Sequence, residues 1–480
     1  MNTTLDQLEQ LTDAARAAAP VWRNAAGATK AGWLRAIADA LEAHVDELVA
    51  IADRETRLGE VRLRGEVGRT TGQLRMFAGV VEEGAYLEII VDDADPGATP
   101  PRPDLRRLLV GVGPVAVFSA SNFPFAFSVA GGDTASALAS GNPVIVKAHS
   151  GHPELSRRTA EVVIAALRAA GAPDGSFALV EGREAGNALV QHPVIQAAGF
   201  TGSVSGGRAL FDLASGRPDP IPFYGELGSV NPVVITPAAA AARAEGLAAG
   251  LAASFTLGAG QFCTKPGVVF VPEGAGFEDH LAGAVATAAG GPLLTDRITD
   301  AFPVGIDRLR DDAAVSVIAE GAETPDGARP LVLATTAAAV SARPDALLEE
   351  VFGPVTLLVR YTGDDDLQAA LRAVPGSLTA TLHSEAGDEV AETVDLLQQR
   401  AGRVLFSGWP TGVAVTWSQH HGGPWPATTS VHTSVGATAI RRFLRPVAFQ
   451  DAPQHVLPAP LRDEALAVTP HRRNGALVLP

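Results

Sequence analysis

The sequence predicts an α/β protein that contains a doubly wound parallel sheet, followed by a second α/β region. From about residue 112, short apolar stretches alternate with helical ones, as in "GPVAVFSAS" (113–121), "GGDTASALASG", "NPVIVKA" and "ELSRRTAEVVIAALRAAG". The 50 Gly and 34 Pro residues favour the many tight turns that such short elements need. Because parallel strands are joined by helical crossovers, this alternation predicts parallel strands with ligands at their carboxyl ends.

Composition limits the class of protein. A chain of 480 residues with 46% hydrophobic residues is long enough for about two or three domains. Its net charge of −16 argues against a nucleic-acid surface, because phosphate binding needs an excess of Lys and Arg. A single cysteine cannot form an internal disulfide and suits a reducing compartment. With neither a signal-peptide pattern nor a run of ~20 apolar residues, we expect a cytoplasmic protein with small-molecule partners, no nucleic acid and no membrane.

Each element follows from a local pattern. Residues 1–88 are expected to be mostly helical, since apolar side chains recur at steps of three and four residues: Leu34, Ile37, Leu41, Val45 and Leu48. The stretches "SFALVEG" and "AAGFTGS" continue the strands, and "VSGGRALFDLAS" is a helix that starts with glycines. After an Ala-rich helix that ends in "SFTLG", a second strand series follows: "GVVFVPEG", "PVTLLVRY", "LTATLHS" and "GRVLFSG". The Pro-rich stretch 92–111 and "RRFLRPVAFQ" interrupt this order with additional strands.

The only cysteine lies in "LGAGQFCTKPG" (257–267). A lone cysteine is usually a buried, inert apolar residue. Here its glycines and Pro266 allow the backbone to approach a ligand closely, and Thr264 and Lys265 do not suit an apolar core. A nucleophilic thiolate needs an electropositive or amide-rich setting. No histidine comes with the signature of a hydrolase base, so an activator other than histidine is expected.

Two polar residues follow apolar strands. Asn122 in "SNFPF" is either a turn residue or an amide donor toward a developing oxyanion at a strand carboxyl end. Glu226 in "YGELGSVNP" is either a solvated surface charge or a general base whose pKa partial burial raises. Both alternatives remain open at the level of single residues.

Five motifs together resemble the aldehyde dehydrogenase superfamily: "SNFP", "FTGS", "ELG", "GQFC" and "EEVFGP" occur in its order and approximate spacing, and the similarity runs from about residue 10 to 450. The resemblance implies that Cys263 is the catalytic nucleophile, Asn122 the oxyanion donor and Glu226 the general base. It further implies that Lys147 holds the adenosine ribose. The remaining implied cofactor positions are Gly202 and Ser203 for the pyrophosphate, and Glu350 and Phe352 for the nicotinamide ribose and ring.

The same resemblance implies an architecture and a reaction. It predicts a Rossmann-type parallel-sheet cofactor domain (1–88 and 112–228), an α/β catalytic domain (229–443), and an oligomerisation arm with a C-terminal surface tail (89–111 and 444–480). A homodimer or homotetramer is implied. The implied reaction oxidises an aldehyde to a carboxylic acid through a cysteine thiohemiacetal and thioester.

No metal is expected. The histidine pairs 149/152 and 420/421 come with no second cysteine, no HExxH motif and no carboxylate partner in register.

The cofactor is predicted from charge. Ser150 stands three residues after Lys147, where many NAD-using relatives carry a glutamate that binds the ribose hydroxyls. Without that carboxylate the site does not repel a 2′-phosphate, and a hydroxyl can donate to one. NADP is therefore favoured, and NAD remains possible. Arg183 is either the positive partner of that phosphate or a solvated arginine.

Several stretches, among them "KAHSGHP" and "QHHGGPWPATT", resemble a subgroup centred on α-ketoglutaric semialdehyde (2,5-dioxopentanoate) dehydrogenases of bacterial sugar-acid and hydroxyproline degradation; NADP-linked fatty aldehyde dehydrogenases are also similar. A distal carboxylate would need a cationic partner, for which Arg69 and Arg75 are candidates, although helical arginines are more often structural. The implied substrate pocket consists of Phe123, Phe127, Phe262, Thr264, Trp417 and Trp425. Ser229 replaces the glycine that many relatives place after "ELG".

Two other classes compete with a dehydrogenase. A cysteine esterase or thioesterase would use Cys263 and Glu226 without any nucleotide. A non-catalytic protein of the same fold would be expected to have lost at least one active residue, yet all three are present.

Overall fold

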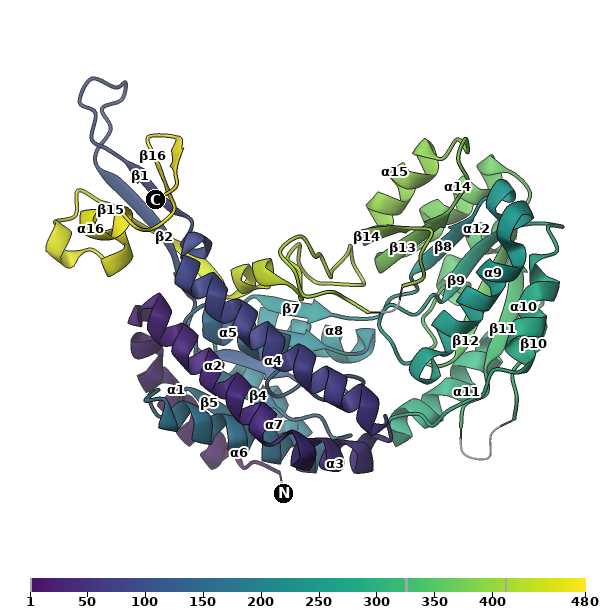
Figure 1. The fold of residues 1–480 in the computed structure, drawn as a ribbon, viewed down its shortest axis with the longest axis horizontal. Coiled ribbons are helices and arrows are strands. Elements are labelled where there is room, and N and C mark those ends of the chain that lie inside the picture. The colour runs from purple at the N-terminus through teal and green to yellow at the C-terminus, as the bar shows by residue number, and fades with distance from the viewer. Residues whose placement is uncertain (1, 324–326, 411) are drawn as a thin grey trace.

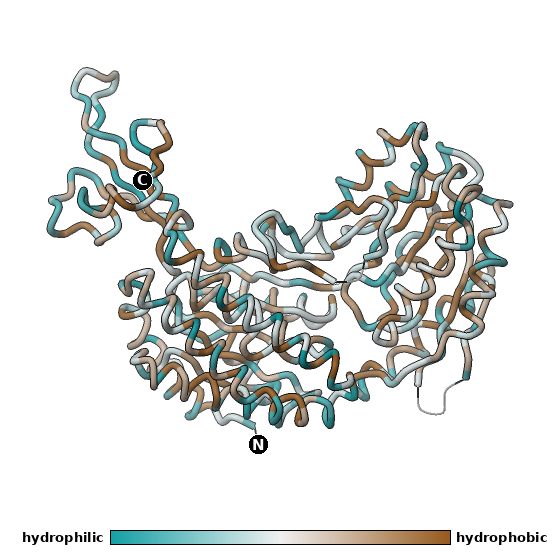
Figure 2. Tube along the Cα trace, in the orientation of Figure 1, coloured by the Kyte–Doolittle hydropathy of each residue, from teal (hydrophilic) through white to brown (hydrophobic). Residues whose placement is uncertain are grey.

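The structure is a computed structural model that describes residues 2–323, 327–410 and 412–480. Three sheets organise the chain, and in Figure 1 two α/β halves lie side by side while an arm projects from the far end of the first half. Figure 2 shows apolar segments along the strands and helices of both halves. The α/β class predicted from the sequence is confirmed.

The first half begins with the predicted helical region. Its helices are α1 (Leu5–Asn24), α2 (Gly27–Ala43), α3 (Val45–Thr56) and α4 (Glu60–Glu83), followed by the 3-10 turn η1 (Ala85–Leu87). Helix α2 packs against α4 and α6 (Pro153–Ala169). Their apolar faces bury Leu34, Leu74 and Phe77 in one core, which gives the first sheet a helical cover.

The first sheet is parallel, as predicted. Its order is β5 (Phe177–Val180), β4 (Val144–Lys147), β3 (Val115–Phe118), β6 (Ala197–Thr201) and β7 (Phe223–Glu226). The connecting helices are α5 (Gly132–Ala139), α6, α7 (Arg183–Gln191) and α8 (Val204–Ser215). The chain moves outward in opposite directions from β3 and β6, so these neighbours form the switch point beside which doubly wound sheets bind ligands.

The second half contains a seven-stranded sheet. Its order is β10 (Ser316–Glu320), β11 (Leu331–Thr336), β12 (Val355–Tyr361), β9 (Val268–Pro272), β8 (Pro232–Ile235), β13 (Ser377–His383) and β14 (Ala401–Phe406). Only the pairing of β10 with β11 is antiparallel. The helical elements are α9 (Pro237–Thr256), η2 (Leu257–Gly260), α10 (Phe277–Ala286), α11 (Asp296–Arg310), α12 (Ala337–Ala342), α13 (Pro344–Leu347), α14 (Asp364–Ala373) and α15 (Ala391–Arg400). Helix α9 is the predicted Ala-rich helix, and it leads directly to the cysteine.

After β14 the chain returns to the first half. This return segment (407–410 and 412–436) contacts β7, where Leu227 N donates to Ala427 O at 2.8 Å and Thr429 N to Gly225 O at 3.1 Å. It ends in η3 (Ala437–Phe443), whose Ile440 and Phe443 are buried in the core of the first half. The predicted catalytic range, 229–443, thus includes residues 437–443, which pack in the core of the first half. The division of the chain into the predicted domains stays a prediction.

The arm is a third sheet of order β15 (Leu444–Gln450), β2 (Leu105–Gly111), β1 (Ile89–Asp92), β16 (His471–Arg473) and β17 (Ala476–Val478). The expected surface tail contributes two of these strands, together with η4 (Gln454–Val456), η5 (Ala459–Leu461) and α16 (Asp463–Leu466). Three apolar residues of the tail, Leu457, Leu461 and Leu466, are buried against β1 and β2, because these strands present an apolar face to cover. No helix among the described residues is long and apolar enough to cross a membrane.

Candidate active site

The cysteine loop is shaped by close contact between backbones. Helix α9 ends in η2, where Gly258 and Gly260 have φ of 58° and 69°, in the left-handed region that favours glycine. A Cβ on Gly260 would lie 2.2 Å from the carbonyl of Gly353, so only glycine fits there. Cys263 as a whole residue is partly exposed, while the protein atoms around its sulfur desolvate the thiol, so it is neither open to solvent nor sealed in an apolar core.

The thiol lies beside a histidine and a carboxylate. Cys263 Sγ is 3.5 Å from His421 Nε2, and the same nitrogen is 3.0 Å from Glu226 Oε1. The other oxygen of Glu226 accepts a 2.6 Å hydrogen bond from Ser434. Glu226 ends β7 and is only 2% exposed, so it is not the solvated surface charge of the alternative interpretation.

Burial and nearby charges determine the protonation states of Cys263 and Glu226. Burial raises the pKa of Cys263 well above its usual value, and the charge of Glu226 raises it further, while Arg69 opposes them. Burial also acts to raise the pKa of Glu226, but His421 and the hydrogen bonds outweigh it and hold that pKa below its ordinary value. The raised pKa expected for this carboxylate is therefore wrong, because its buried partners stabilise the charge. At neutral pH the unliganded site therefore combines a protonated thiol with an ionised carboxylate.

The Asn122 side chain lies at the same place. It is buried in the loop after β3, and its Nδ2 donates to Gln261 O at 3.0 Å, two residues before the cysteine. Arg62 fixes the Asn122 backbone by donating to its carbonyl at 2.6 Å. A side-chain amide has two N–H groups, and the second is available to a developing oxyanion.

Asn231 holds the cysteine loop from behind. It is buried with φ 49°, and its Nδ2 donates to Cys263 O and to Lys265 O, both at 2.9 Å. Its Oδ1 accepts from Ser229 Oγ at 2.6 Å and from the N–H of Thr379 on β13 at 3.1 Å. Ser229 also accepts from Leu378 N at 2.9 Å, so the serine that replaces a glycine serves to tie the loop to β13.

Side chains expected to hold the cofactor follow β4 and β6. Lys147 ends β4 and is partly buried, and Ser150, three residues later, is exposed. Ser203 caps α8 by accepting from Gly206 N at 3.2 Å, and the preceding Gly202 is exposed. The uncovered start of α8 beside the switch point fits a pyrophosphate, because helix N-termini bind anions.

Two further titratable side chains lie near the expected cofactor residues in the sequence, Arg183 and His149. Arg183 is the exposed first residue of α7, and its two interpretations stay open. Burial lowers the pKa of His149 to about 3, so this ring, stacked on His152 at 5.6 Å between centroids, is neutral at physiological pH and adds no positive charge for a phosphate.

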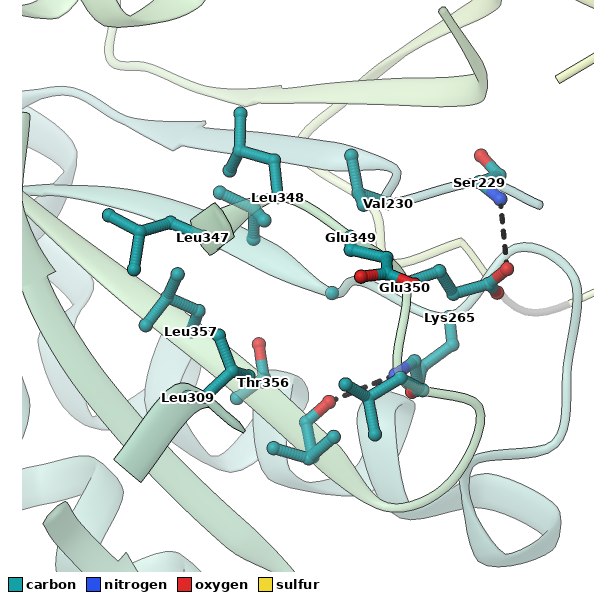
Figure 3. Close-up of a pocket in the computed structure, with 14 residues that line it drawn as sticks. Ser229, Val230, Lys265, Leu309, Leu347, Leu348, Glu349, Glu350, Thr356 and Leu357 are labelled. Carbon is teal, nitrogen blue, oxygen red and sulfur yellow. Dashed lines mark hydrogen bonds between the residues drawn. The ribbon is translucent and has the colours of Figure 1, made fainter. Parts of the chain in front are cut away.

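Glu350 is anchored in the second half of the molecule. Its Oε2 accepts from Ser229 N at 3.2 Å, as Figure 3 shows. Burial raises the pKa of Glu350 to about 7 and lowers that of Lys265 to about 8, while Lys265 Nζ donates to the carbonyls of Val351 and Val355. The cavity in Figure 3 measures about 20 Å³, room for about one water molecule. Phe352, two residues after Glu350, is partly exposed.

Three of the expected pocket residues form one aromatic cluster. The ring of Phe123 lies 5.4 Å from Phe127 and 5.2 Å from Phe262, and Phe127 lies 6.4 Å from the ring of His421. Thr264 is buried. Trp417 and Trp425 are 55% and 48% exposed, and no ring contact joins them to this phenylalanine cluster in the part of the chain that the structure describes.

Sequence reasoning missed the most informative neighbour of the thiol. The expectation that His421 has no carboxylate partner is wrong, because Glu226 from β7 reaches it across a separation of 195 residues. His421 also makes an activator other than histidine unnecessary. Donor atoms of Glu226, Cys263 and His421 lie within 4.8 Å of one another, a set that also suits a thiophilic cation. The absence of a metal therefore stays a prediction.

Together, fold and site define a class. A doubly wound parallel sheet with an uncovered helix N-terminus at its switch point fits a dinucleotide. Beside it lie a thiol, a buried carboxylate and a side-chain amide, the groups needed for covalent chemistry at a carbonyl. These features define a thiol-dependent oxidoreductase.

Comparison with known proteins names the family. The profile of the aldehyde dehydrogenase family matches residues 1–444. The chain is 47% identical over 479 residues to alpha-ketoglutaric semialdehyde dehydrogenase 2 of Azospirillum brasilense, covering 98% of this chain and 91% of that one. It is 43% identical to alpha-ketoglutaric semialdehyde dehydrogenase of Acinetobacter baylyi, covering 96% and 89%. The chain belongs to the aldehyde dehydrogenase family.

Solved structures share the fold. A variant of proline utilization A from Bradyrhizobium japonicum matches with a TM-score of 0.79 and 25% identity over 94% of this chain. The present chain spans 46% of that longer protein. The predicted fold is confirmed, and the protein is an aldehyde dehydrogenase that uses a nicotinamide dinucleotide and acts on small aldehydes.

The effect of Glu226 on the thiol gives a prediction with a definite sign. Glu226→Gln removes the charge that raises the pKa of Cys263, so the thiolate fraction at pH 7.5 increases. We expect iodoacetamide to inactivate this variant about 3- to 30-fold faster than the wild type, since each pKa unit changes the thiolate tenfold. In the wild type the rate should keep rising through pH 9. Glu245→Gln, which alters an exposed carboxylate on α9, is the control; a slower rate in Glu226→Gln contradicts the prediction.

The contacts of Asn231 give a second prediction. Asn231→Ala leaves the Cys263 and Lys265 carbonyls without their side-chain donor and puts alanine at a left-handed position. Unfolding in urea should show a loss of about 2–4 kcal/mol, and kcat should fall because the thiol loses its position. Asn474→Ala, at φ 48° in the arm, is the control. Equal effects of both substitutions would refute a special role for Asn231.

Proposed function

We propose that this enzyme oxidises α-ketoglutaric semialdehyde (2,5-dioxopentanoate) to 2-oxoglutarate with NADP. The observation that carries the proposal is the 47% identity, over nearly the whole chain, to a relative that bears this substrate in its name. The grouping of Cys263, Glu226 and Asn122 around one point supports a complete catalytic site.

The proposed chemistry uses the contacts described above. The sulfur of Cys263 adds to the aldehyde carbon as its S–H bond breaks, and the proton passes to the ionised carboxylate of Glu226, which contacts the same nitrogen of His421 as the thiol. The carbonyl oxygen becomes negative and accepts from the Asn122 amide, which such a donor can stabilise by about 3 kcal/mol. When bound, the nicotinamide supplies the acceptor for the hydride that leaves the thiohemiacetal.

The second half of the reaction returns the enzyme to its resting state. It requires water to attack the thioester carbon. Once the proton taken from the thiol has passed to solvent, Glu226 is ionised again and takes a proton from that water as general base. The carbon–sulfur bond then breaks, the carboxylic acid leaves, and Cys263 regains its proton.

Several residues would hold the cofactor. Lys147 contacts the adenosine ribose, Gly202 and Ser203 the pyrophosphate, and Glu350 and Phe352 the nicotinamide ribose and ring. Ser150 accommodates the 2′-phosphate, with Arg183 as its cationic partner. The exposure of Ser150, Ser203 and Arg183 supports these roles.

Oligomerisation through the arm is also proposed. Strands β15 and β17 are the two edges of the arm sheet, and an unpaired edge is able to pair with another chain. A homodimer or homotetramer assembled through this sheet follows, in a cytoplasmic protein.

A second candidate activity rests on the contact between Cys263 and His421. A thiol beside an imidazole favours cleavage of esters or thioesters without nucleotide. The thiol and Glu226 approach the same ring nitrogen, Nε2, at 3.5 and 3.0 Å, which differs from a hydrolase triad, whose carboxylate binds the other nitrogen. The phenylalanine cluster favours long-chain aldehydes within the dehydrogenase class.

The test of function compares substrates on the purified enzyme, in parallel with and without a chelator. Formation of reduced nicotinamide is followed with 2,5-dioxopentanoate, succinic semialdehyde and a long-chain aldehyde, and ester cleavage without cofactor is measured alongside. We expect the highest kcat/KM with 2,5-dioxopentanoate and NADP, and loss of all reduction in Cys263→Ala. A preference for the long-chain aldehyde rejects the proposed substrate. Ester cleavage without any reduction rejects the dehydrogenase, and activity lost to the chelator indicates a metal.

Cofactor choice has its own test. Ser150→Glu places a carboxylate near the proposed 2′-phosphate, and like charges repel. We expect kcat/KM for NADP to fall about 10- to 100-fold while that for NAD stays or rises. Ser150→Ala, which removes only the hydroxyl, should change the NADP value less than about fivefold. An unchanged preference in Ser150→Glu places the phosphate elsewhere.

A further inference from the structure

Two arginines lie at the thiol without a function in the chemistry described so far. Arg69 comes from α4 in the first half, and Arg403 from β14 in the second. The Cys263 thiolate acts to raise the pKa of both guanidinium groups, while burial lowers them. Arg403 also contacts the return segment that carries His421, since its Nη1 donates to Gly412 O at 3.4 Å.

Arg69 lies against the phenylalanine cluster. Its guanidinium is 5.8 Å from the ring centre of Phe123 and 5.2 Å from that of Phe127, and Phe127 in turn contacts the ring of His421. The buried Nε of Arg69 has no hydrogen-bond partner among the described residues. A buried guanidinium nitrogen without an acceptor is costly, so an acceptor from outside the chain fits here.

The charged side chains near Arg69, Glu66 and Arg62, do not supply an acceptor for its Nε. Glu66, one turn earlier on α4, accepts from the backbone N–H groups of Phe125 and Ala126 at 2.8 and 3.0 Å. Its other oxygen is buried without a hydrogen-bond partner in the described part of the chain. Arg62, which lies over Phe123 and Phe262, is already bonded to the Asn122 carbonyl. Arg69 thus differs from its neighbours in having a free donor beside the aromatic wall.

Arg403, from the second half of the molecule, also has guanidinium nitrogens without acceptors among the described residues. Its Nε and Nη2 are buried with no hydrogen-bond partner among the described residues, and Nη1 reaches only Gly412 O at 3.4 Å. In a chain of net charge −16, two guanidinium groups with unused donors next to one thiol concentrate positive charge where the aldehyde must bind.

The geometry points to Arg69 and Arg403 as a carboxylate-binding pair that selects aldehydes bearing a negative charge at the end remote from the carbonyl. This inference deepens the proposed function and rests on it for the aldehyde chemistry. A planar guanidinium pairs with a carboxylate through two parallel N–H donors. The phenylalanine rings that Arg69 contacts accommodate the short methylene chain that joins the two ends of such a substrate.

Arg75 serves as the matched control. It lies on the same helix α4, but its guanidinium is paired with Asp39 and Glu42 of α2 at 2.7 and 2.5 Å. Of the two arginines that the sequence offered for a distal carboxylate, the structure therefore leaves only Arg69 with an unused donor.

The experiment measures selectivity as a ratio, using the full-length enzyme with its cofactor. The ratio is kcat/KM for 2,5-dioxopentanoate divided by kcat/KM for pentanal, which has the same chain length without a carboxylate. In Arg69→Met and in Arg403→Met we expect this ratio to fall about 30- to 1000-fold, mainly through KM for the acid. Arg69→Lys should recover part of the ratio, and Arg75→Met should keep it within about threefold.

The outcomes separate this inference from the proposed substrate. If the wild type prefers another acid semialdehyde, such as succinic semialdehyde, the proposed substrate fails, but a ratio that falls in the variants with that substrate supports the pair. If both variants lose acid and neutral aldehyde equally, or keep the wild-type ratio, the pair does not bind a carboxylate. A wild type that favours pentanal overturns it as well.

Discussion

The catalytic arrangement depends on one buried side chain, Asn231, which ties the cysteine loop to the second sheet. The glycines of the cysteine loop bring no side chains of their own, and the Gly260–Gly353 approach leaves only backbone contacts there. Lys265 holds the far end of the loop by donating to the carbonyls of Val351 and Val355. Asn231 supplies the missing constraint, since its amide donates to the carbonyls on both sides of the loop while its oxygen accepts from β13. Asparagine meets both demands, because it tolerates the left-handed backbone and carries a donor and an acceptor on one short side chain.

A second constraint brings the remaining catalytic groups to the thiol. Glu226 arrives at the end of β7, Asn122 from the loop after β3, and His421 from the return segment. The return segment is fixed to β7 by backbone hydrogen bonds, so the histidine and the carboxylate are held by the same pairing. The contact between them thus follows from how the chain crosses back from the second sheet to the first, and the site forms only where the two halves meet.

This explains which features the sequence could predict. Periodicity and turn residues are local, so the helices before β1 and the strands from β3 to β6 were predictable, and the ordered motifs identified the nucleophile, the amide and the carboxylate. His421 was considered only as a metal ligand with its sequence neighbour, because nothing local indicates a carboxylate 195 residues away. Ser434 and Gln261 were missed for the same reason. The tail after residue 452 carries the apolar residues that cover β1, but their partners lie more than 350 positions earlier, and a Pro-rich, charged composition concealed them.

The groups that Asn231 and the return segment bring together also determine how nucleophilic the Cys263 thiol is. A desolvated sulfur beside an ionised carboxylate keeps its proton, so the resting enzyme presents a weak nucleophile. The same carboxylate, however, is kept ionised by its partners and lies at the same ring nitrogen of His421 as the sulfur, so it can take up the proton that the sulfur loses. Glu226 therefore acts in two opposite senses: it disfavours a free thiolate, and it favours transfer of the proton at the moment the sulfur bonds to carbon. Such an arrangement ties nucleophilicity to the presence of an electrophile in the pocket, because no charged sulfur has to persist before the aldehyde arrives.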